Sequence, residues 1–238
     1  MDSRWIKIIA IVLMTIDHVG IILFPDIKVL RIIGRLCYPL IAFLIAYGCT
    51  KTRNISRYFL RLMMFAVWMQ IAWAALGFIN PALKPEFNNI FFTLAFGVLA
   101  IWIIRHLRQG SPVASGADKV FFVGFSCIMA VIVCAFAGVL QVDYGMPGVM
   151  IIILFWAMMQ IKTHKTIDKF IMPVLVLVAF NVLYMAMSGW GAQWWSMLSV
   201  IFIWLFIDKK RRAHWAEKYS FYIYYPLHFV ILFIVAFA

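Results

Sequence analysis

The sequence predicts an all-α protein, a polytopic bundle of about nine transmembrane helices, from its composition, its hydropathy pattern and its charge distribution. Of the 238 residues, 66% are hydrophobic and 13% are charged, whereas soluble domains average about 45–50% apolar and about 25% charged residues. Because nearly all of its length is apolar enough to lie in a membrane, the chain is expected to form a single integral membrane domain over residues 1–238.

Nine apolar runs define the predicted helices in chain order. Their limits are 5–24, 30–49, 58–78, 89–107, 120–140, 146–161, 170–187, 191–207 and 219–237. A helix needs about 20 residues to cross a bilayer, so the short sixth and eighth runs are expected to be tilted or partly re-entrant. The first run exceeds the apolar part of a signal peptide and lacks a small-residue cleavage site, so it is expected to remain a span. Pro39 is expected to kink the second run.

Lysine and arginine are divided unevenly between the two sides of this predicted bundle. Of the 21, 17 fall on the side of the N-terminus and 4 fall on the other side, namely Lys28, Arg31, Arg35 and Lys84. Because basic residues collect on the cytoplasmic side, the N-terminus is predicted to be cytoplasmic and the C-terminus extracytoplasmic. The net charge of +12 is therefore attributed to membrane topology. Membrane lipid is the expected partner, and no nucleic acid is expected.

The four cysteines all fall inside apolar runs, at positions 37, 49, 127 and 134. They are expected to be small core residues rather than disulfide partners. No Cys or His spacing in the sequence suggests a metal site.

Asp17 and His18 lie inside the first apolar run, where ionisable groups are costly. An Asp near the centre of a transmembrane helix costs roughly 2.5–3.5 kcal/mol, and such residues usually serve a substrate, proton or ion path. His18 shares a helical face with Lys7 and Thr15, whereas Asp17 points about 100° away from it. The first run therefore carries the leading candidates for a functional site.

The second run places Arg31, Gly34, Arg35 and Tyr38 on one helical face at its outer end. Two arginines at this depth need carboxylate partners, and the candidates are Asp17, Asp26, Glu86 and Asp143. One interpretation is an interhelical ion-paired lock. The other is a positively charged pocket wall that also holds Asp17.

Other polar residues are predicted at the same level in the outer half. Asn89 and Thr93 begin the fourth run, and Asp143 and Tyr144 open the sixth. Each alone would fit a helix cap or a loop, but together they point to a cavity. His228 lies near the middle of the last run, where it either forms an interhelical hydrogen bond or belongs to the site.

A cluster of basic residues, comprising Lys51, Arg53, Arg57 and Arg61, precedes or enters the third run on the predicted cytoplasmic side. It is either topogenic or a contact for the phosphates of a cytoplasmic donor, since Arg forms forked hydrogen bonds to phosphate.

Five segments of the chain stand out as motifs: IAIVLMTIDHVG with ILFP, LRIIGRLCYPLIAFLIAYG, NNIFFT at 88–93, VDYGMPGV at 142–149 and YYPLHF at 224–229. Together they resemble the TraX family of bacterial membrane proteins. The resemblance spans essentially the whole chain, although residues 160–215 match in hydropathy alone. It implies a multi-pass protein of the bacterial inner (cytoplasmic) membrane.

The resemblance also implies an activity, because TraX proteins are similar to transmembrane acyltransferases. The founding member is associated with N-terminal acetylation of a conjugative pilin. Family-3 membrane acyltransferases carry a basic residue, ten residues and then a His in their first span, which Lys7 and His18 match. They also carry an Arg pair at a cytoplasmic helix end, whereas Arg57 and Arg61 stand one residue further apart than that pair.

The expected function is therefore acyl transfer from acetyl-CoA to an amine or hydroxyl acceptor on a pilin, a glycan or a small molecule. The catalytic candidates are His18 as general base, Asp17 as the orienting carboxylate, either paired with Arg35 or aiding the proton path, and Arg35 itself. The substrate-binding candidates are Arg31, Tyr38, Asn89, Thr93, Asp143, Tyr144 and His228. The acetyl-CoA candidates are Lys7, Arg53, Arg57 and Arg61. The alternatives are a proton-coupled transporter or permease and a non-enzymatic assembly subunit of a conjugation or secretion system.

Overall fold

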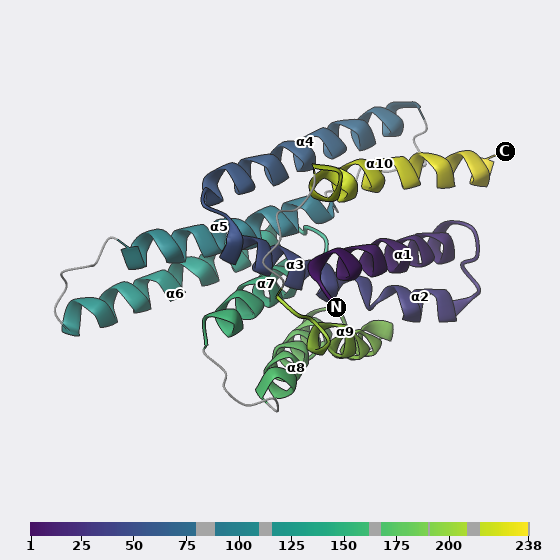
Figure 1. Cartoon of the computed structure of the whole chain (residues 1–238). Helices are drawn as coiled ribbons and strands as arrows, with labels where there is room; N and C mark the ends of the chain where they lie inside the picture. The colour runs from purple at the N-terminus through teal and green to yellow at the C-terminus, as the bar shows by residue number, and fades with distance from the viewer. Residues whose placement is uncertain (80–88, 110–115, 162–167, 190, 209–214, 238) are drawn as a thin grey trace. The chain divides into compact units, whose positions relative to one another are not determined.

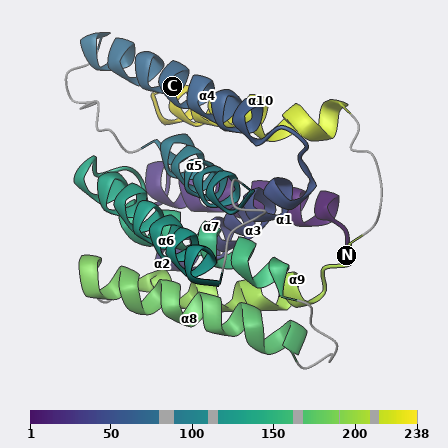
Figure 2. The same ribbon diagram turned by 90° about the vertical axis from the view of Figure 1, so that its left-hand side faces the viewer.

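The computed structural model confirms an all-helical protein over the residues that it describes, which are 1–79, 89–109, 116–161, 168–189, 191–208 and 215–237 (Figures 1 and 2). The α-helices are α1 (Ser3–Ile22), α2 (Lys28–Gly34), α3 (Cys37–Lys51), α4 (Ile55–Ile79), α5 (Ile90–Gln109), α6 (Gly116–Val139), α7 (Gly145–Gln160), α8 (Asp168–Ser188), α9 (Val200–Trp204) and α10 (Trp215–Phe237). A 3₁₀-helix, η1 (Ala192–Ser199), leads directly into α9.

Every predicted apolar run contains helix. In the described part of the chain, 7 helical segments are long and apolar enough to cross a membrane, and Gly145–Gln160 and Ala192–Trp204 are shorter apolar helices. These two shorter helices are the sixth and eighth runs. Large apolar side chains such as Met64 (71% exposed) and Val139 (78% exposed) point outward, which suits a surface covered by lipid rather than water. The chain is thus a multi-pass membrane protein, and the orientation of its termini stays a prediction.

The helices group into two compact units. Unit 1 contains Met1–Leu44 and Ile161–Ala238, and unit 2 contains Ile45–Gln160. The prediction of one domain over residues 1–238 stays a prediction, and each unit is described by itself.

In unit 1, α1 packs against α2 and α10, and η1 packs against α2 and α8. The Asp2 side chain caps α1 by accepting from the backbone N–H groups of Arg4 and Trp5 at 3.1 and 3.4 Å. The Met1 ammonium donates to the Leu205 carbonyl at 2.7 Å, and the Ile207 N–H donates to the Met1 carbonyl at 2.7 Å. The start of α1 is therefore attached to the end of α9 (Figure 1).

The second predicted run is divided between two helices, because α2 ends at Gly34 and α3 begins at Cys37. The interruption lies at residues 35–36, within one turn before Pro39, and agrees with the predicted kink, because proline has no N–H for the carbonyl of residue 35 and its ring clashes with that carbonyl. Pro39 lies in the first turn of α3, where the N–H that proline lacks has no intrahelical acceptor. One consequence is that Tyr38 does not continue the helix that carries Arg31.

The cysteines are free thiols, but they do not all lie in the core. Cys37, Cys49 and Cys134 are buried, whereas Cys127 is exposed, which corrects the prediction for that residue. Hydropathy could not separate the two cases, because α6 carries apolar residues on its outward face as well as on the face that packs against α5 and α7.

In unit 2, α5 packs against α4, α6 and α7 (Figure 2). A larger share of α5 is buried than of any other long apolar helix. At its C-terminal end, Arg105 Nη1 donates to the Cys49 carbonyl at 2.9 Å. This bond satisfies one of the last carbonyls of α3, which have no intrahelical donor.

The absence of a side chain at Gly97 allows the close contact between α5 and α7. A Cβ atom there would lie 2.6 Å from Ile152 Cδ1 and 2.9 Å from Ile152 Cγ2. We expect Gly97→Ala to lower the free energy of unfolding by about 2 kcal/mol, because forced overpacking typically costs that much. Unfolding in mixed micelles measures this loss. The double variant Gly97→Ala/Ile152→Ala should recover part of the lost free energy of unfolding. A double variant that is no more stable than Gly97→Ala would contradict the close contact between Gly97 and Ile152.

Candidate functional site

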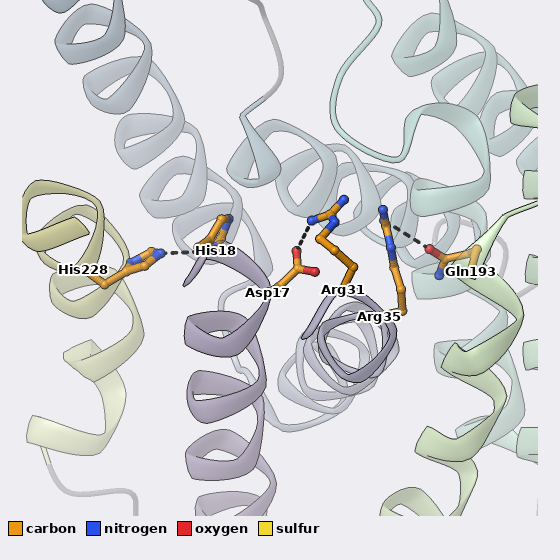
Figure 3. A network of polar contacts seen from close by, with 6 residues as sticks. All are labelled: Asp17, His18, Arg31, Arg35, Gln193 and His228. Atoms are coloured by element: carbon orange, nitrogen blue, oxygen red, sulfur yellow. Dashed lines mark hydrogen bonds and ion pairs between the residues drawn. The ribbon is translucent and has the colours of Figure 1, made fainter. Parts of the chain in front are cut away.

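Six polar side chains from four helical segments of unit 1 follow one another in a row (Figure 3). In order they are His228 of α10, His18 and Asp17 of α1, Arg31 of α2, Arg35 directly after α2, and Gln193 of η1. Five of these six are residues that the sequence singled out. The structure thus brings together the candidates from the first, second and last predicted runs.

The charged centre of this row is an ion pair between α1 and α2. Arg31 Nη1 donates to Asp17 Oδ2 at 2.9 Å, with side-chain exposures of 29% and 17% respectively. The hydrogen-bonded ion pair of Asp17 is therefore with Arg31, whereas the sequence had offered Arg35 as one possible partner. The reason is local: α2 ends at Gly34, and the Arg35 guanidinium reaches η1 instead, where its Nη1 donates to Gln193 Oε1 at 3.4 Å.

Gly34 lets α2 approach Asp17 closely. A Cβ atom at Gly34 would lie 2.2 Å from Asp17 Oδ1 and 2.3 Å from Asp17 Cβ. Asp17 Oδ1 is buried and has no hydrogen-bond partner among the described residues. The carboxylate therefore bonds through Oδ2 to Arg31, while its other oxygen packs on the glycine backbone.

We expect Gly34→Ala to push α1 and α2 apart, since one of the contacted atoms is the Cβ of Asp17 and not the end of a flexible chain. The free energy of unfolding should fall by about 2 kcal/mol. Gly124→Ala is the matched control, because a Cβ there meets nothing within 4 Å and Ala favours a helix by about 1 kcal/mol over Gly. Equal effects of the two variants in mixed-micelle unfolding would refute the close approach at Gly34.

The imidazole end of the row joins α1 to α10. His228 Nε2 lies 3.0 Å from His18 Nδ1, and His228 Nδ1 lies 3.1 Å from the Tyr224 carbonyl oxygen. One turn earlier on α1, Thr15 Oγ1 lies 2.6 Å from the Tyr224 hydroxyl. Thr15 and His18 therefore share the face that contacts α10, which agrees with the predicted helical face.

Two other candidates of unit 1 lie outside this row. Tyr38 is 2% exposed and its ring packs against Phe180 of α8, with ring centroids 5.8 Å apart. Lys7 is half-buried on α1, 11 residues before His18, which is about three helical turns. Its predicted contact with acetyl-CoA stays a prediction.

Gln193 belongs to a buried polar stripe that the sequence reasoning missed. Gln193, Ser196 and Ser199 are 0–3% exposed, and a 3₁₀-helix aligns residues three apart because it has about 3.0 residues per turn. Ser196 bonds to Asn181 of α8 at 2.9 Å. The signal in the sequence was a polar residue at every third position of QWWSMLS, which a search at the α-helical period of about 3.6 passes over.

The outer candidates of unit 2 bond within that unit. Asn89 Nδ2 donates to the Ala66 carbonyl at 2.8 Å, and Asn89 Oδ1 accepts from the Phe91 N–H at 3.0 Å, so this residue caps α5 and ties it to α4. The Thr93 hydroxyl donates to the Asp143 carbonyl. Tyr144 follows with a positive φ of 58°. These bonds support a structural role, and substrate contact by these residues stays a prediction.

The basic candidates of unit 2 lie at the start of α4. Asn54 caps this helix by accepting from the Arg57 N–H at 2.9 Å, Arg53 and Arg57 are exposed, and the Arg61 guanidinium lies 5.2 Å from the Tyr58 ring centroid. Their predicted role in binding phosphate stays a prediction. The carboxylate predicted at Glu86 lies outside the described residues. Among the described residues, no group of three or more His, Cys, Asp or Glu side chains could hold a metal ion.

Comparisons with known proteins cover between 70% and nearly all of the chain. It is 27% identical to the probable fimbrial assembly protein FimC, serogroup H1, of Dichelobacter nodosus, over 95% of this chain and 92% of that protein. It is 26% identical to an uncharacterized protein of Rickettsia prowazekii (strain Madrid E), over 70% of this chain and 59% of that protein. No solved structure matches. The profile of the TraX protein family matches residues 3–236, and the chain therefore belongs to the TraX family.

Proposed function

We propose that this protein is a membrane-embedded acyltransferase of the bacterial inner membrane, with His18 as general base. The observation that carries the proposal is the hydrogen bond from the His18 ring to a second buried imidazole, next to a helix-to-helix ion pair. An imidazole held in one orientation beside cationic groups can take a proton from an acceptor and keep the developing negative charge close to positive charge.

The proposed reaction transfers an acetyl group from acetyl-CoA. His18 takes a proton from the amine or hydroxyl of the acceptor, whose nitrogen or oxygen attacks the thioester carbonyl carbon. The carbon–sulfur bond then breaks, and the leaving CoA thiolate takes up the proton that His18 had accepted, which returns His18 to its neutral form. Arg31 and Arg35 stabilise the oxyanion of the intermediate. Basic residues on the predicted cytoplasmic side hold the phosphates of CoA.

The acceptor that we favour is the N-terminal amine of a pilin. The support comes from the similar Dichelobacter nodosus protein, which is named as a probable fimbrial assembly protein. A glycan hydroxyl and a small amine are the other acceptors that this chemistry would serve.

The test is thiol release from acetyl-CoA by the purified protein in nanodiscs. The acceptor is a synthetic peptide with a pilin N-terminus, and the matched control is the same peptide with its amine already acetylated. We expect thiol release with the free peptide alone and a mass increase of one acetyl group on that peptide. A binding isotherm for CoA, measured in parallel, separates an absent donor site from an unsuitable acceptor. No binding of CoA and no thiol release would refute the proposal.

The name of the relative also favours a second candidate, a non-enzymatic assembly subunit for fimbriae. This function predicts normal fimbriation in cells whose only copy carries His18→Phe, provided that the protein is present in the membrane at its usual level. An acyltransferase predicts loss of acetylated pilin in the same cells. Transport of a labelled solute by proteoliposomes, without acyl transfer, would instead point to a transporter.

A further inference from the structure

The hydrogen bonds around His228 define which of its ring nitrogens carries a proton. The Tyr224 carbonyl can only accept, so the bond of 3.1 Å to His228 Nδ1 requires hydrogen on that nitrogen. A neutral imidazole carries one hydrogen, which leaves His228 Nε2 as an acceptor. The bond of 3.0 Å between His228 Nε2 and His18 Nδ1 must then be donated by His18.

This chain of bonds also defines the state of His18. With hydrogen on Nδ1, neutral His18 keeps its lone pair on Nε2. The nitrogen that can take a proton is therefore Nε2, on the side of the ring away from the bond to His228.

The surroundings of His228 keep it in place. Its side chain is 3% exposed, and its ring stacks on that of Tyr224 with an interplanar angle of 2° and centroids 5.4 Å apart. Tyr224 is itself held, because Thr15 Oγ1 donates to the Ile11 carbonyl at 2.9 Å and so must accept from the Tyr224 hydroxyl. Both neighbours on α10 and α1 thus restrict rotation of the His228 ring.

We propose that His228 is a positioning residue for His18, which it holds in the tautomer that has a basic Nε2. The predicted role of His228 was substrate binding, and the geometry favours this different role because both of its ring nitrogens are engaged by the protein. The inference deepens the proposed function, since it rests on His18 acting as the general base.

The first readout is independent of activity. The protein is labelled with ¹⁵N-histidine, and the ring nitrogens of His18 are identified by their loss in His18→Gln. We expect hydrogen on Nδ1 of His18 in the natural protein. His228→Phe should move the hydrogen to Nε2 or give a mixture, whereas His228→Gln should preserve Nδ1–H, because its side-chain oxygen can replace the Nε2 acceptor.

The second readout is acyl transfer. We expect His228→Phe to lower kcat at least about tenfold with little change in KM, and His228→Gln to recover most of that loss. Tyr224→Phe is the matched control: it removes the hydrogen bond to Thr15 between the same two helices but keeps the carbonyl that bonds to His228. It should leave the His18 tautomer unchanged.

The two proposals can fail separately. Hydrogen on Nε2 of His18 in the natural protein, or the same tautomer in His228→Phe, would overturn the positioning role whatever the activity. If His18 carries hydrogen on Nδ1 but the protein binds no CoA and releases no thiol, the acyltransferase proposal is refuted. The positioning of His18 by His228 is then still supported. If His228→Phe does not fold, the His228→Gln spectrum and the Tyr224→Phe control still decide the tautomer.

Discussion

Replacing His18 with alanine is expected to lower the rate of acyl transfer by at least about a hundredfold, with CoA binding unchanged. General base catalysis contributes about 10²–10⁴-fold, and alanine removes the imidazole, while the neighbouring Asp17 carboxylate is engaged by Arg31. The measurement is thiol release from acetyl-CoA under saturating donor. His106→Ala is the matched control, because His106 is exposed on α5 of unit 2. It should keep the natural rate.

The stability of the same variants shows whether the effect is chemical. His18→Ala also removes the bond to His228, so its free energy of unfolding is measured next to its rate. A neutral hydrogen bond contributes about 1 kcal/mol, which leaves the protein folded at the assay temperature. Full activity in a folded His18→Ala protein would remove His18 from the role of general base.

Asp17→Asn is expected to lower the free energy of unfolding by about 3 kcal/mol. Removing one partner of a buried ion pair leaves the other charge without compensation, which costs about 3–5 kcal/mol. The lower end of this range applies because the Arg31 side chain is 29% exposed. Reversible unfolding in mixed micelles measures the change, and Arg31→Met should give a similar loss.

The double variant Asp17→Asn/Arg31→Met separates the two interpretations of this pair. Without either charge, most of the stability should return, since neutral replacements of a whole buried pair are often tolerated. If the pair is only an interhelical lock, acyl transfer returns together with stability. If it belongs to the site, the double variant is stable and inactive. We expect the second result. A double variant as unstable as Asp17→Asn would contradict the coupling between the two residues.

The helices could be predicted from the sequence because one physical quantity, hydropathy over about 20 residues, decides where a chain crosses a membrane. The two shorter helices followed from the same quantity. Hydropathy alone did not reveal the break after Gly34, because the run is apolar overall before and after it; the sequence signal for the break was Pro39. That break decides which arginine reaches Asp17, so the choice of Arg31 over Arg35 depended on it.

The site could be predicted in its residue types but not in its pairings. Asp17, His18 and the two arginines stood out because charge is costly in lipid. The contact of His18 with His228 depends on α1 packing against α10, which no local pattern encodes. Gln193 was missed because its stripe has the period of a 3₁₀-helix rather than that of an α-helix.

The two halves of the row differ in when they can form during synthesis. Asp17 and Arg31 are 14 residues apart in the chain, whereas His18 and His228 are 210 apart. At about 5–20 residues per second, α10 leaves the ribosome roughly 10–40 s after α1. The ion pair between Asp17 and Arg31 can form as soon as α1 and α2 have inserted. The hydrogen bond of His18 to His228 can form only after α10 has been synthesised. An incomplete chain would thus hold the charged pair without an oriented base, so any acyl transfer should begin only once α10 has joined α1 in the membrane.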